Sequence, residues 1–303
     1  MKNQPIADAV LHEVRSINVV SLFNGMNTGR IALENQGFKV NKYYSSEIKP
    51  YAIELTQHHH PDTIQVGDVN KWREWNIDWS QVDLILSGSP CQDLSSQGKR
   101  AGLNGDNSSL FFVFVEILNH CRKFNPNVKF LQENVGSASK KDIGIMSREL
   151  GVYPVRINSS LVTAQLRDRY YWTNIRTKES IFDVISDIPQ PIDRKIQLQQ
   201  VLTDGFTKRK KSQVLLERRA FCYKDEFSKN AQRFLKTREK YGTIVIHLKN
   251  GMMRTVNKIE MCRLQGFPDN YCDILNEDKA QSLLGDGWTL PIIEHILSFY
   301  VFP

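Results

Sequence analysis

Short apolar runs alternate with amphipathic stretches over residues 17–175, and this alternation constrains the fold more than any other feature of the chain. Strand-like runs are predicted at 17–23, 39–47, 63–68, 82–88, 128–135, 153–162 and 169–175. Helix-like stretches are predicted at 28–37, 50–59, 108–124 and 142–151. Strands that alternate with helices in this way predict an α/β fold, in which helices cover both faces of a mostly parallel sheet.

Small or acidic residues follow the predicted strands, at the edge where parallel strands end and ligands bind. The first strand leads into the turn "FNGMNTG" (23–29), the second into Glu47 and the third into Asp68. The turn lacks the G-x-G-x-x-G pattern that cradles a pyrophosphate, whereas an acid placed like Glu47 can bind ribose hydroxyls. Either acid alone is more often a solvated surface residue. Their serial placement favours a nucleoside-bearing cofactor such as S-adenosylmethionine.

Cys91, in "GSPCQDLS" (88–95), and Glu133 come after two further strands and form a chemical pair. A thiolate adds to an electrophilic carbon, and a carboxylic acid can protonate the ring that accepts it. By residue type alone, Cys91 would be a buried and inert thiol, and Glu133 a surface acid. Their placement beside the cofactor turn instead favours a nucleophile and a catalytic acid.

Arg167 and Arg169 alternate with other residues in "QLRDRYYW" (165–172). On a strand, both side chains point to one face of the sheet. Two guanidinium groups on that face could hold a base oxygen and a phosphate. The alternative is a solvent-facing edge strand in which the arginines pair with aspartate.

Residues 177–253 lose the alternation and are rich in Lys and Arg, and the whole chain carries a formal net charge of +7. This composition favours a polyanionic partner and predicts an inserted basic module, followed after residue 254 by two helical stretches. No apolar run reaches the roughly 18 residues of a membrane helix. Five cysteines without a C-x-x-C pair indicate neither a disulfide framework nor a zinc site. We therefore expect a protein of the reducing cytoplasm.

In this order the motifs resemble those of the DNA cytosine-5 methyltransferase family. The resemblance covers about residues 17–176 and 254–303, and its motifs are "SLFNGMNTG", Glu47, "GDV" (67–69), "GSPCQDLS", "QENV" (132–135), "QLRDRYYW", "RTVNKIEMCRLQGFPD" (254–269) and "GDGWTLPII" (285–293). "GSPC", "SSLFF" and the Trp of "GDGW" look closest to the catalytic domains of animal de novo methyltransferases. Gln92 and "RLQGFPD" look bacterial, so the resemblance implies a compact enzyme of bacteria or their phages.

The resemblance implies a Rossmann-like class I S-adenosylmethionine-dependent methyltransferase fold. It implies a catalytic domain formed by 1–176 and 254–303, with a small target-recognition domain at 177–253. Its catalytic residues are Cys91, Glu133, Arg167 and Arg169. Its cofactor contacts are Phe23, Asn24, Gly25, Met26, Thr28, Gly29, Glu47, Ile48, Asp68, Val69, Pro90, Gln92, Leu110 and Trp288. Its DNA contacts are Ser95, Gln97, Lys99 and Arg100, in a Gly- and Ser-rich loop expected to close over DNA, and Lys208, Arg209, Lys210 and Lys211.

The implied reaction moves a methyl group from S-adenosylmethionine to carbon 5 of a cytosine flipped out of double-stranded DNA, without a metal. Cys91 adds to carbon 6, Glu133 holds the exocyclic amine and protonates ring nitrogen 3, and Arg169 binds the base carbonyl. Monomer and homodimer both stay open.

Two departures from the family pattern bear on the cofactor site. Asn24 stands where close relatives often have Asp, and Asp286-Gly287 replaces a turn that contains Asn in many bacterial members. Three alternatives are an RNA methyltransferase of the same fold, acting on tRNA, an inactive DNA-binding partner subunit, and a generic α/β enzyme with a different nucleophilic cysteine. The last leaves the order of the motifs unexplained. The tRNA branch usually carries a Cys-Phe-Thr element, which is absent here. An inactive subunit would not need the nucleophile, the acid and the arginine pair together.

Overall fold

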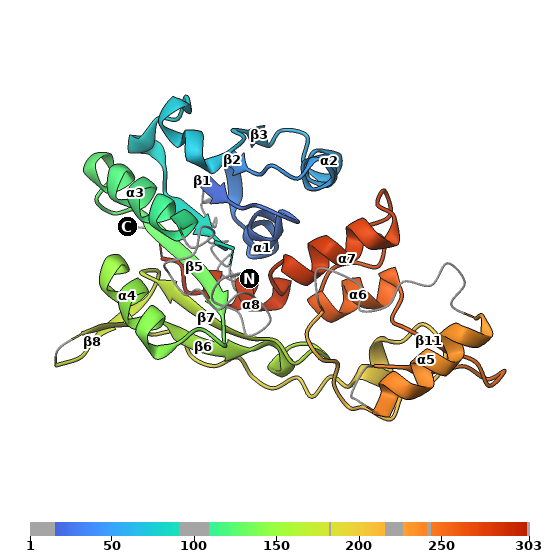
Figure 1. Cartoon of the computed structure of the whole chain (residues 1–303). Helices are drawn as coiled ribbons and strands as arrows, with labels where there is room; N and C mark the ends of the chain where they lie inside the picture. Colours follow the sequence, from blue (N-terminus) through green and yellow to red (C-terminus); the bar gives the residue numbers. More distant parts are fainter. Residues whose placement is uncertain (1–15, 91–108, 182, 216–226, 241–243, 302–303) are drawn as a thin grey trace, which may run out of the picture.

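The computed structural model describes residues 16–90, 109–181, 183–215, 227–240 and 244–301, and Figure 1 shows their arrangement. A seven-stranded sheet in the order β3-β2-β1-β4-β5-β7-β6 forms the centre. Its strands are β1 (Ser16–Leu22), β2 (Lys39–Ser46), β3 (Ile64–Gln65), β4 (Leu84–Ser87), β5 (Lys129–Val135), β6 (Val155–Asn158) and β7 (Asp168–Thr173). Neighbouring strands pair in parallel, except that β7 runs antiparallel to β5 and β6. The prediction of a mostly parallel sheet in an α/β fold is therefore confirmed.

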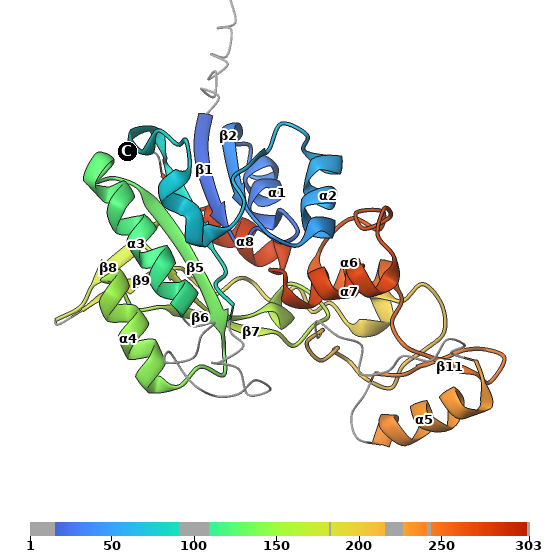
Figure 2. The same cartoon turned by 45° about the horizontal axis from the view of Figure 1, so that its top comes forward.

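Helices cover both faces of the sheet (Figure 2). The helices on one face are α1 (Thr28–Asn35), α2 (Pro50–His59) and α8 (Leu290–Leu297), and those on the other are α3 (Ser109–Phe124) and α4 (Lys140–Leu150). Strand β1 shows how the two cores form, because Val19 packs into the first and Val20 into the second. A run of apolar residues without alternation is typical of a parallel strand that is covered on both sides.

The C-terminal region differs from the prediction of two helical stretches. It holds three helices, α6 (Lys258–Gln265), α7 (Glu277–Asp286) and α8, and Gly287–Thr289 separates the last two. Pro291 lies in the first turn of α8, where its missing N–H is tolerated, whereas a continuous helix would lose a hydrogen bond there. Short 3₁₀ turns elsewhere are Val69–Glu74, Trp79–Gln81, Ser159–Leu161 and Leu198–Val201.

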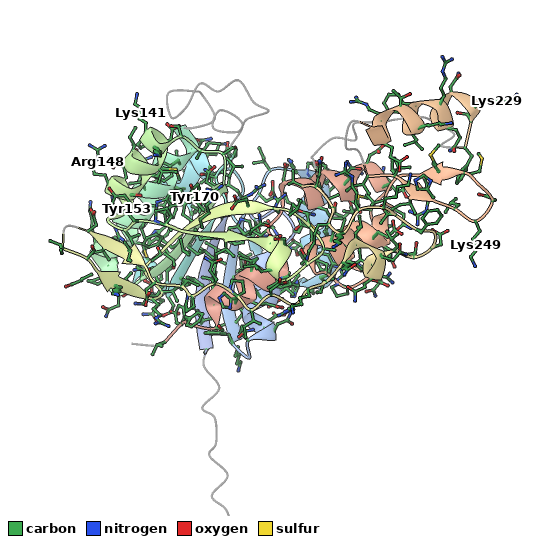
Figure 3. All side chains as sticks on the ribbon, turned by 90° about the horizontal axis from the view of Figure 1, so that it is seen from below. Lys141, Arg148, Tyr153, Tyr170, Lys229 and Lys249 are labelled. Carbon is green, nitrogen blue, oxygen red and sulfur yellow. The ribbon has the colours of Figure 1, made fainter. Side chains whose placement is uncertain are left out.

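The described residues of 177–253 include two separate groups of elements. Strands β8 (Thr177–Glu179) and β9 (Val184–Ser186) pair beside the sheet, where the Tyr153 amide donates to the Val184 carbonyl at 2.7 Å. A distal lobe lies beyond α6 and α7, and its elements are α5 (Lys229–Lys240), β10 (Ile246–His247) and β11 (Met253–Arg254) (Figure 1). Figure 3 shows Lys229 and Lys249 on this lobe, across the molecule from Lys141 and Arg148 of α4.

A buried ion-pair network joins the distal lobe to α6. Arg254, at the end of β11, is 7% exposed, and its guanidinium lies 2.7 Å from the carboxylate of Glu260, which is fully buried. Arg254 also pairs with Asp204. Glu260 accepts further hydrogen bonds from the backbone amides of Thr203 at 2.8 Å and Asn257 at 3.0 Å, the latter completing a capping box at the start of α6. One carboxylate thus connects the segment around Thr203 with the segment that runs from the end of β11 into α6.

Candidate active site

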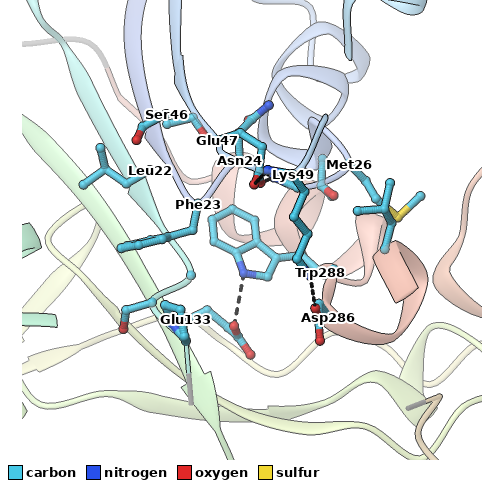
Figure 4. A pocket seen from close by; sticks show the side chains of 18 of the residues that line it. Leu22, Phe23, Asn24, Met26, Ser46, Glu47, Lys49, Glu133, Asp286 and Trp288 are labelled. Carbon is cyan, nitrogen blue, oxygen red and sulfur yellow. Dashed lines mark hydrogen bonds and ion pairs between the residues drawn. The ribbon is translucent and has the colours of Figure 1, made fainter. Parts of the chain in front are cut away.

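A cavity of about 350 Å³ opens at the carboxyl ends of β1, β2, β4 and β5 (Figure 4). Its walls also include the C-terminal end of α7 and the arginines at the start of β7. This is the position at which ligands bind in open α/β sheets, and the volume lies within the usual range of small-molecule sites.

The turn after β1 has a strained backbone. Phe23 (φ 55°), Gly25 (φ 55°) and Asn27 (φ 59°) all lie in the left-handed region, which costs a residue other than glycine about 1–3 kcal/mol. Gly29 meets a different need, because a Cβ there would lie 2.3 Å from Cδ1 of Leu86. Helix α1 can therefore begin directly against β4. Strained residues of this kind cluster at ligand sites. Here their left-handed conformations turn the backbone around the cavity.

Glu47 ties this turn to the end of β2. One carboxylate oxygen accepts a hydrogen bond from the Gly25 amide at 2.8 Å, and the other accepts from the amides of Ile48 at 2.8 Å and Lys49 at 2.9 Å. A carboxylate offers about four acceptor sites, so Glu47 can still accept a bond from a ligand hydroxyl.

The lining of the cavity fits S-adenosylmethionine. Ile48 lines the cavity and is nevertheless 71% exposed, which leaves an apolar surface beside the acid of Glu47. Asp68 lies at the next strand end and accepts from the Asn70 amide at 2.9 Å. Acids for hydroxyl and amine groups next to an apolar surface for a flat ring are what an adenosine group needs.

Asn24 is held by a chain of hydrogen bonds that sequence reasoning missed. Its amide nitrogen donates to Oδ1 of Asn27 at 3.2 Å, and its amide oxygen accepts from the Tyr43 hydroxyl at 3.2 Å. Nδ2 of Asn27 lies 3.0 Å from Nδ1 of His60, and Nε2 of His60 lies 3.1 Å from Oε2 of Glu34. The His60 hydrogen bond lowers the pKa of Glu34. An ionised aspartate at position 24 could not donate to Asn27. The asparagine that replaces the aspartate of close relatives therefore has its own acceptor here, Oδ1 of Asn27.

Glu133 lies within β5 and is 8% exposed, so it is not a surface acid. The guanidinium Nε of Arg169 lies 2.8 Å from its Oε1 atom. The indole N–H of Trp288 donates to its Oε2 atom at 3.1 Å. Both carboxylate oxygens therefore have a donor from the protein.

Arg167 binds backbone carbonyl groups at the end of α7. Its guanidinium donates to Gly285 O at 3.0 Å and to Gly287 O at 2.8 Å, and the residue is 2% exposed. The alternative of a solvent-facing edge strand is wrong for this segment, because β7 lies between β5 and β6. Arg167 and Arg169 both line the cavity, although only Arg169 contacts the acid Glu133.

The structure brings together the predicted catalytic and cofactor residues that it describes, but not the predicted DNA contacts at 208–211. Those that line the cavity are Phe23, Asn24, Gly25, Met26, Thr28, Gly29, Glu47, Ile48, Asp68, Val69, Pro90, Leu110, Glu133, Arg167, Arg169 and Trp288. The predicted residues outside the described ranges are Cys91, Gln92, Ser95, Gln97, Lys99 and Arg100. Pro90, the last described residue before Cys91, lies in the wall of the cavity.

Lys49, Asp286 and Gly88 also line the cavity and were not predicted. Lys49 Nζ and Asp286 Oδ2 form an ion pair of 2.8 Å across a separation of 237 residues. No local pattern signals such a pair. The position of Gly88 directly before "SPC" is a weak sequence indication that it lies at the site. In the structure, a Cβ at this position would lie 2.8 Å from Nε1 of Trp288.

The predicted basic DNA contacts fall into two kinds. The side chains of Lys208, Arg209 and Lys210 are exposed. The Lys211 ammonium group donates to the carbonyls of Ser160 at 2.6 Å and Thr163 at 2.9 Å, and burial lowers its pKa. Lys211 therefore holds two backbone segments together, unlike its three neighbours.

The described ranges hold neither a cluster of metal-binding side chains nor a membrane-spanning helix. No group of three or more His, Cys, Asp or Glu side chains could hold a metal ion there. In the same part of the chain, no helix has the length and apolar character needed to cross a membrane.

Comparison with known proteins gives consistent matches. The family model of C-5 cytosine-specific DNA methylases matches residues 17–250. The Type II methyltransferase M1.ScrFI of Lactococcus lactis subsp. cremoris is 26% identical over 92% of this chain and 76% of its own length. The Type II methyltransferase M.NlaX of Neisseria lactamica is 25% identical over 92% of this chain and 94% of its own. A DNMT2 mutant of Spodoptera frugiperda shares the fold, with a TM-score of 0.61 at 17% identity over 94% of this chain and 99% of that one.

Proposed function

The chain belongs to the family of C-5 cytosine-specific DNA methylases, and from this premise we propose how its residues carry out the reaction. The enzyme transfers a methyl group from S-adenosylmethionine to carbon 5 of cytosine in DNA. The observation that carries the proposal is a single cavity shared by the cofactor turn, Glu47, Glu133 and Arg169, with Pro90 in its wall just before Cys91.

The cofactor half of the cavity holds S-adenosylmethionine. Glu47 would bind the ribose hydroxyls, Ile48 would pack on the adenine ring, and Asp68 would accept from the adenine amine. The turn of residues 23–29 surrounds the amino-acid end. When bound, S-adenosylmethionine would supply an electrophilic methyl group, and the protein would hold the acceptor carbon beside it.

The other half of the cavity activates the base. Cys91, as thiolate, forms a bond to carbon 6 while the proton of Glu133 passes to ring nitrogen 3, which makes carbon 5 nucleophilic. Arg169 binds the base carbonyl oxygen. After methylation a base removes the proton from carbon 5, the Cys91–carbon 6 bond breaks, and nitrogen 3 returns its proton to Glu133. Arg167 supports this arrangement from behind, through the carbonyls at the end of α7.

The experiment that tests the function is methyl transfer from radiolabelled cofactor, followed by bisulfite sequencing of DNA from cells that express the protein. We expect label in duplex DNA and protected cytosines in one short sequence context. Transfer to tRNA with none to duplex DNA would favour the RNA alternative. Binding of DNA without any transfer would favour the inactive partner subunit.

Residues 177–253 form the target-recognition domain, and the loop after Cys91 closes over the DNA through Ser95, Gln97, Lys99 and Arg100. Exposed Lys208, Arg209 and Lys210 contact phosphates, which position DNA without reading its sequence. The reaction takes place in the cytoplasm of a bacterial or phage-infected cell, where the DNA lies. Two relatives named Type II methyltransferases support a place beside a restriction nuclease.

Replacing Lys208, Arg209 and Lys210 together by glutamine is expected to weaken binding of all duplexes alike. The slope of log affinity against log salt should fall by up to about 3, because each phosphate contact contributes about 0.9. Fluorescence anisotropy at several salt concentrations measures it. A matched triple change at exposed Lys39, Lys42 and Lys123 should leave the slope unchanged. Equal slopes in both triple variants would remove these residues from the DNA interface.

A further inference from the structure

Trp288 lies where the two halves of the cavity meet (Figure 4). Its indole N–H donates to Glu133 Oε2 at 3.1 Å, while Arg169 holds the other oxygen of the same carboxylate at 2.8 Å. Glu133 is 8% exposed, so neither bond competes with much solvent. The indole is therefore a second donor to the acid, in addition to any packing against the cofactor.

The position of the indole is set from one side by Gly88. A Cβ on Gly88 would lie 2.8 Å from Nε1 and 3.2 Å from Cε2 of Trp288. Contacts below 3.0 Å with a ring require the ring to move. Absence of a side chain at the end of β4 thus allows the indole N–H to reach the acid on β5.

The backbone that carries Trp288 is held from the other side. Arg167 donates to the Gly287 carbonyl at 2.8 Å, and Gln265 donates to the same carbonyl at 3.3 Å. Thr289, which is 1% exposed, donates to Gln265 Oε1 at 2.7 Å. The chain is thus held on both sides of Trp288, which leaves the indole little freedom to leave Glu133.

We propose that Trp288 is a positioning residue for the catalytic acid. By donating to Oε2, the indole fixes the carboxylate plane and occupies one of its lone pairs. Arg169 occupies another, so the proton that Glu133 delivers must sit on the remaining lone pairs. This inference rests on the proposed role of Glu133, and it adds a residue that acts on the chemical step through the acid.

A role in cofactor packing alone makes a different kinetic prediction. If Trp288 only covers the cofactor, its loss raises the KM for S-adenosylmethionine and leaves kcat unchanged. If it positions Glu133, its loss lowers kcat and leaves that KM nearly unchanged, because the bond is needed in the transition state.

The first test is Trp288→Phe, which keeps an aromatic ring and removes the N–H. We expect kcat to fall about 10- to 100-fold, the range for a hydrogen bond to a charged group. The KM for S-adenosylmethionine should change less than about 3-fold, since less than 1 kcal/mol of binding is lost. A kcat equal to that of the parent enzyme, with a raised KM, would overturn the proposal in favour of cofactor packing.

A second variant reaches the indole from Gly88. Gly88→Ala should lower kcat in the same way, because its Cβ displaces Nε1. In the double variant Gly88→Ala/Trp288→Phe the clash with Nε1 is gone, so kcat should be no lower than in Trp288→Phe alone. If the fold loss of kcat in the double variant equalled the product of the losses in the two single variants, Gly88 would act independently of Trp288.

A spectroscopic readout separates this inference from the proposed function. The chain has five tryptophans, so ¹⁵N-labelled enzyme without cofactor gives few indole N–H signals, and the one missing in Trp288→Phe belongs to Trp288. That signal should move in Glu133→Gln, while the signal of Trp172, which donates to Ser147 at 3.0 Å, should stay. An unmoved Trp288 signal would refute the contact. If the parent enzyme failed to methylate DNA, the function would be wrong, but this contact would still be tested.

Discussion

Replacing Cys91 by serine is expected to lower methyl transfer by about 10⁴-fold or more, as removal of a covalent nucleophile does elsewhere. A serine hydroxyl is not ionised near neutral pH, so it cannot add to carbon 6 without a strong base beside it. The cavity offers Arg167 and Arg169, whose positive charges favour a thiolate. Binding of duplex DNA should persist in Cys91→Ser, because the proposed phosphate contacts are other residues.

Single-turnover methyl transfer measures this loss, and duplex DNA with 5-fluorocytosine at the target traps the intermediate. Fluorine cannot leave as a proton does, so the parent enzyme should give a band that survives denaturation, and Cys91→Ser should give none. Cys121→Ser is the matched control. The Cys121 thiol donates to the Trp79 carbonyl at 3.6 Å, and burial raises its pKa to about 12, so it is chemically inert. Substantial turnover by Cys91→Ser would refute the covalent mechanism.

Replacing Glu260 by alanine is expected to destabilise the protein by about 3–5 kcal/mol, the cost of leaving one charge of a buried pair alone. Glu260 is fully buried, and after its removal the charged partner of Arg254 would be Asp204, whose side chain is 61% exposed. Urea unfolding followed by circular dichroism measures the free energy of unfolding. Asp269→Ala is the control, because the pair of Asp269 with Arg263 is half exposed and should contribute less than about 1 kcal/mol. Equal losses of unfolding free energy in Glu260→Ala and Asp269→Ala would show that the buried ion-pair network contributes no more than an exposed pair.

The same network predicts how stability depends on pH. Burial alone would raise the pKa of Glu260, but the hydrogen bonds from Arg254, Thr203 and Asn257 lower it below its ordinary value. A carboxyl whose pKa is lower in the folded state contributes its full stabilisation at pH values above the pKa that it has in the unfolded chain. That contribution is lost as pH falls through the folded pKa. The stability difference between the parent and Glu260→Ala should therefore shrink in acid.

Much of the active site could be predicted from the sequence because its motifs are local. The cofactor turn, Glu47 and Asp68 each follow one strand, and parallel strands end at the same edge of a sheet. Knowing which segments are strands is then sufficient to bring these residues together. The strand patterns were readable because strands covered on both faces are nearly continuous apolar runs.

The helix break at Gly287–Thr289 was harder to predict, because the apolar spacing of 279–300 continues across it. Pro291 is tolerated in the first turn of a helix and disfavoured in a helix interior, so it indicates a break but does not locate where the first helix ends. What decides is the tertiary contact of Gly287 with Arg167, which the sequence pattern does not contain.

The sequence by itself determined the α/β fold and placed the cofactor turn, Glu47, Asp68 and Glu133 at one edge of the sheet, because these follow from local patterns and from the order of the strands. Only the tertiary structure decided which side chains pair inside that frame. Trp288 meets Glu133 across 155 residues, Arg167 binds the end of α7, and Lys211 holds two carbonyls. The physical reason is that a side chain's partner depends on what packs across from it, and packing joins segments far apart in the chain.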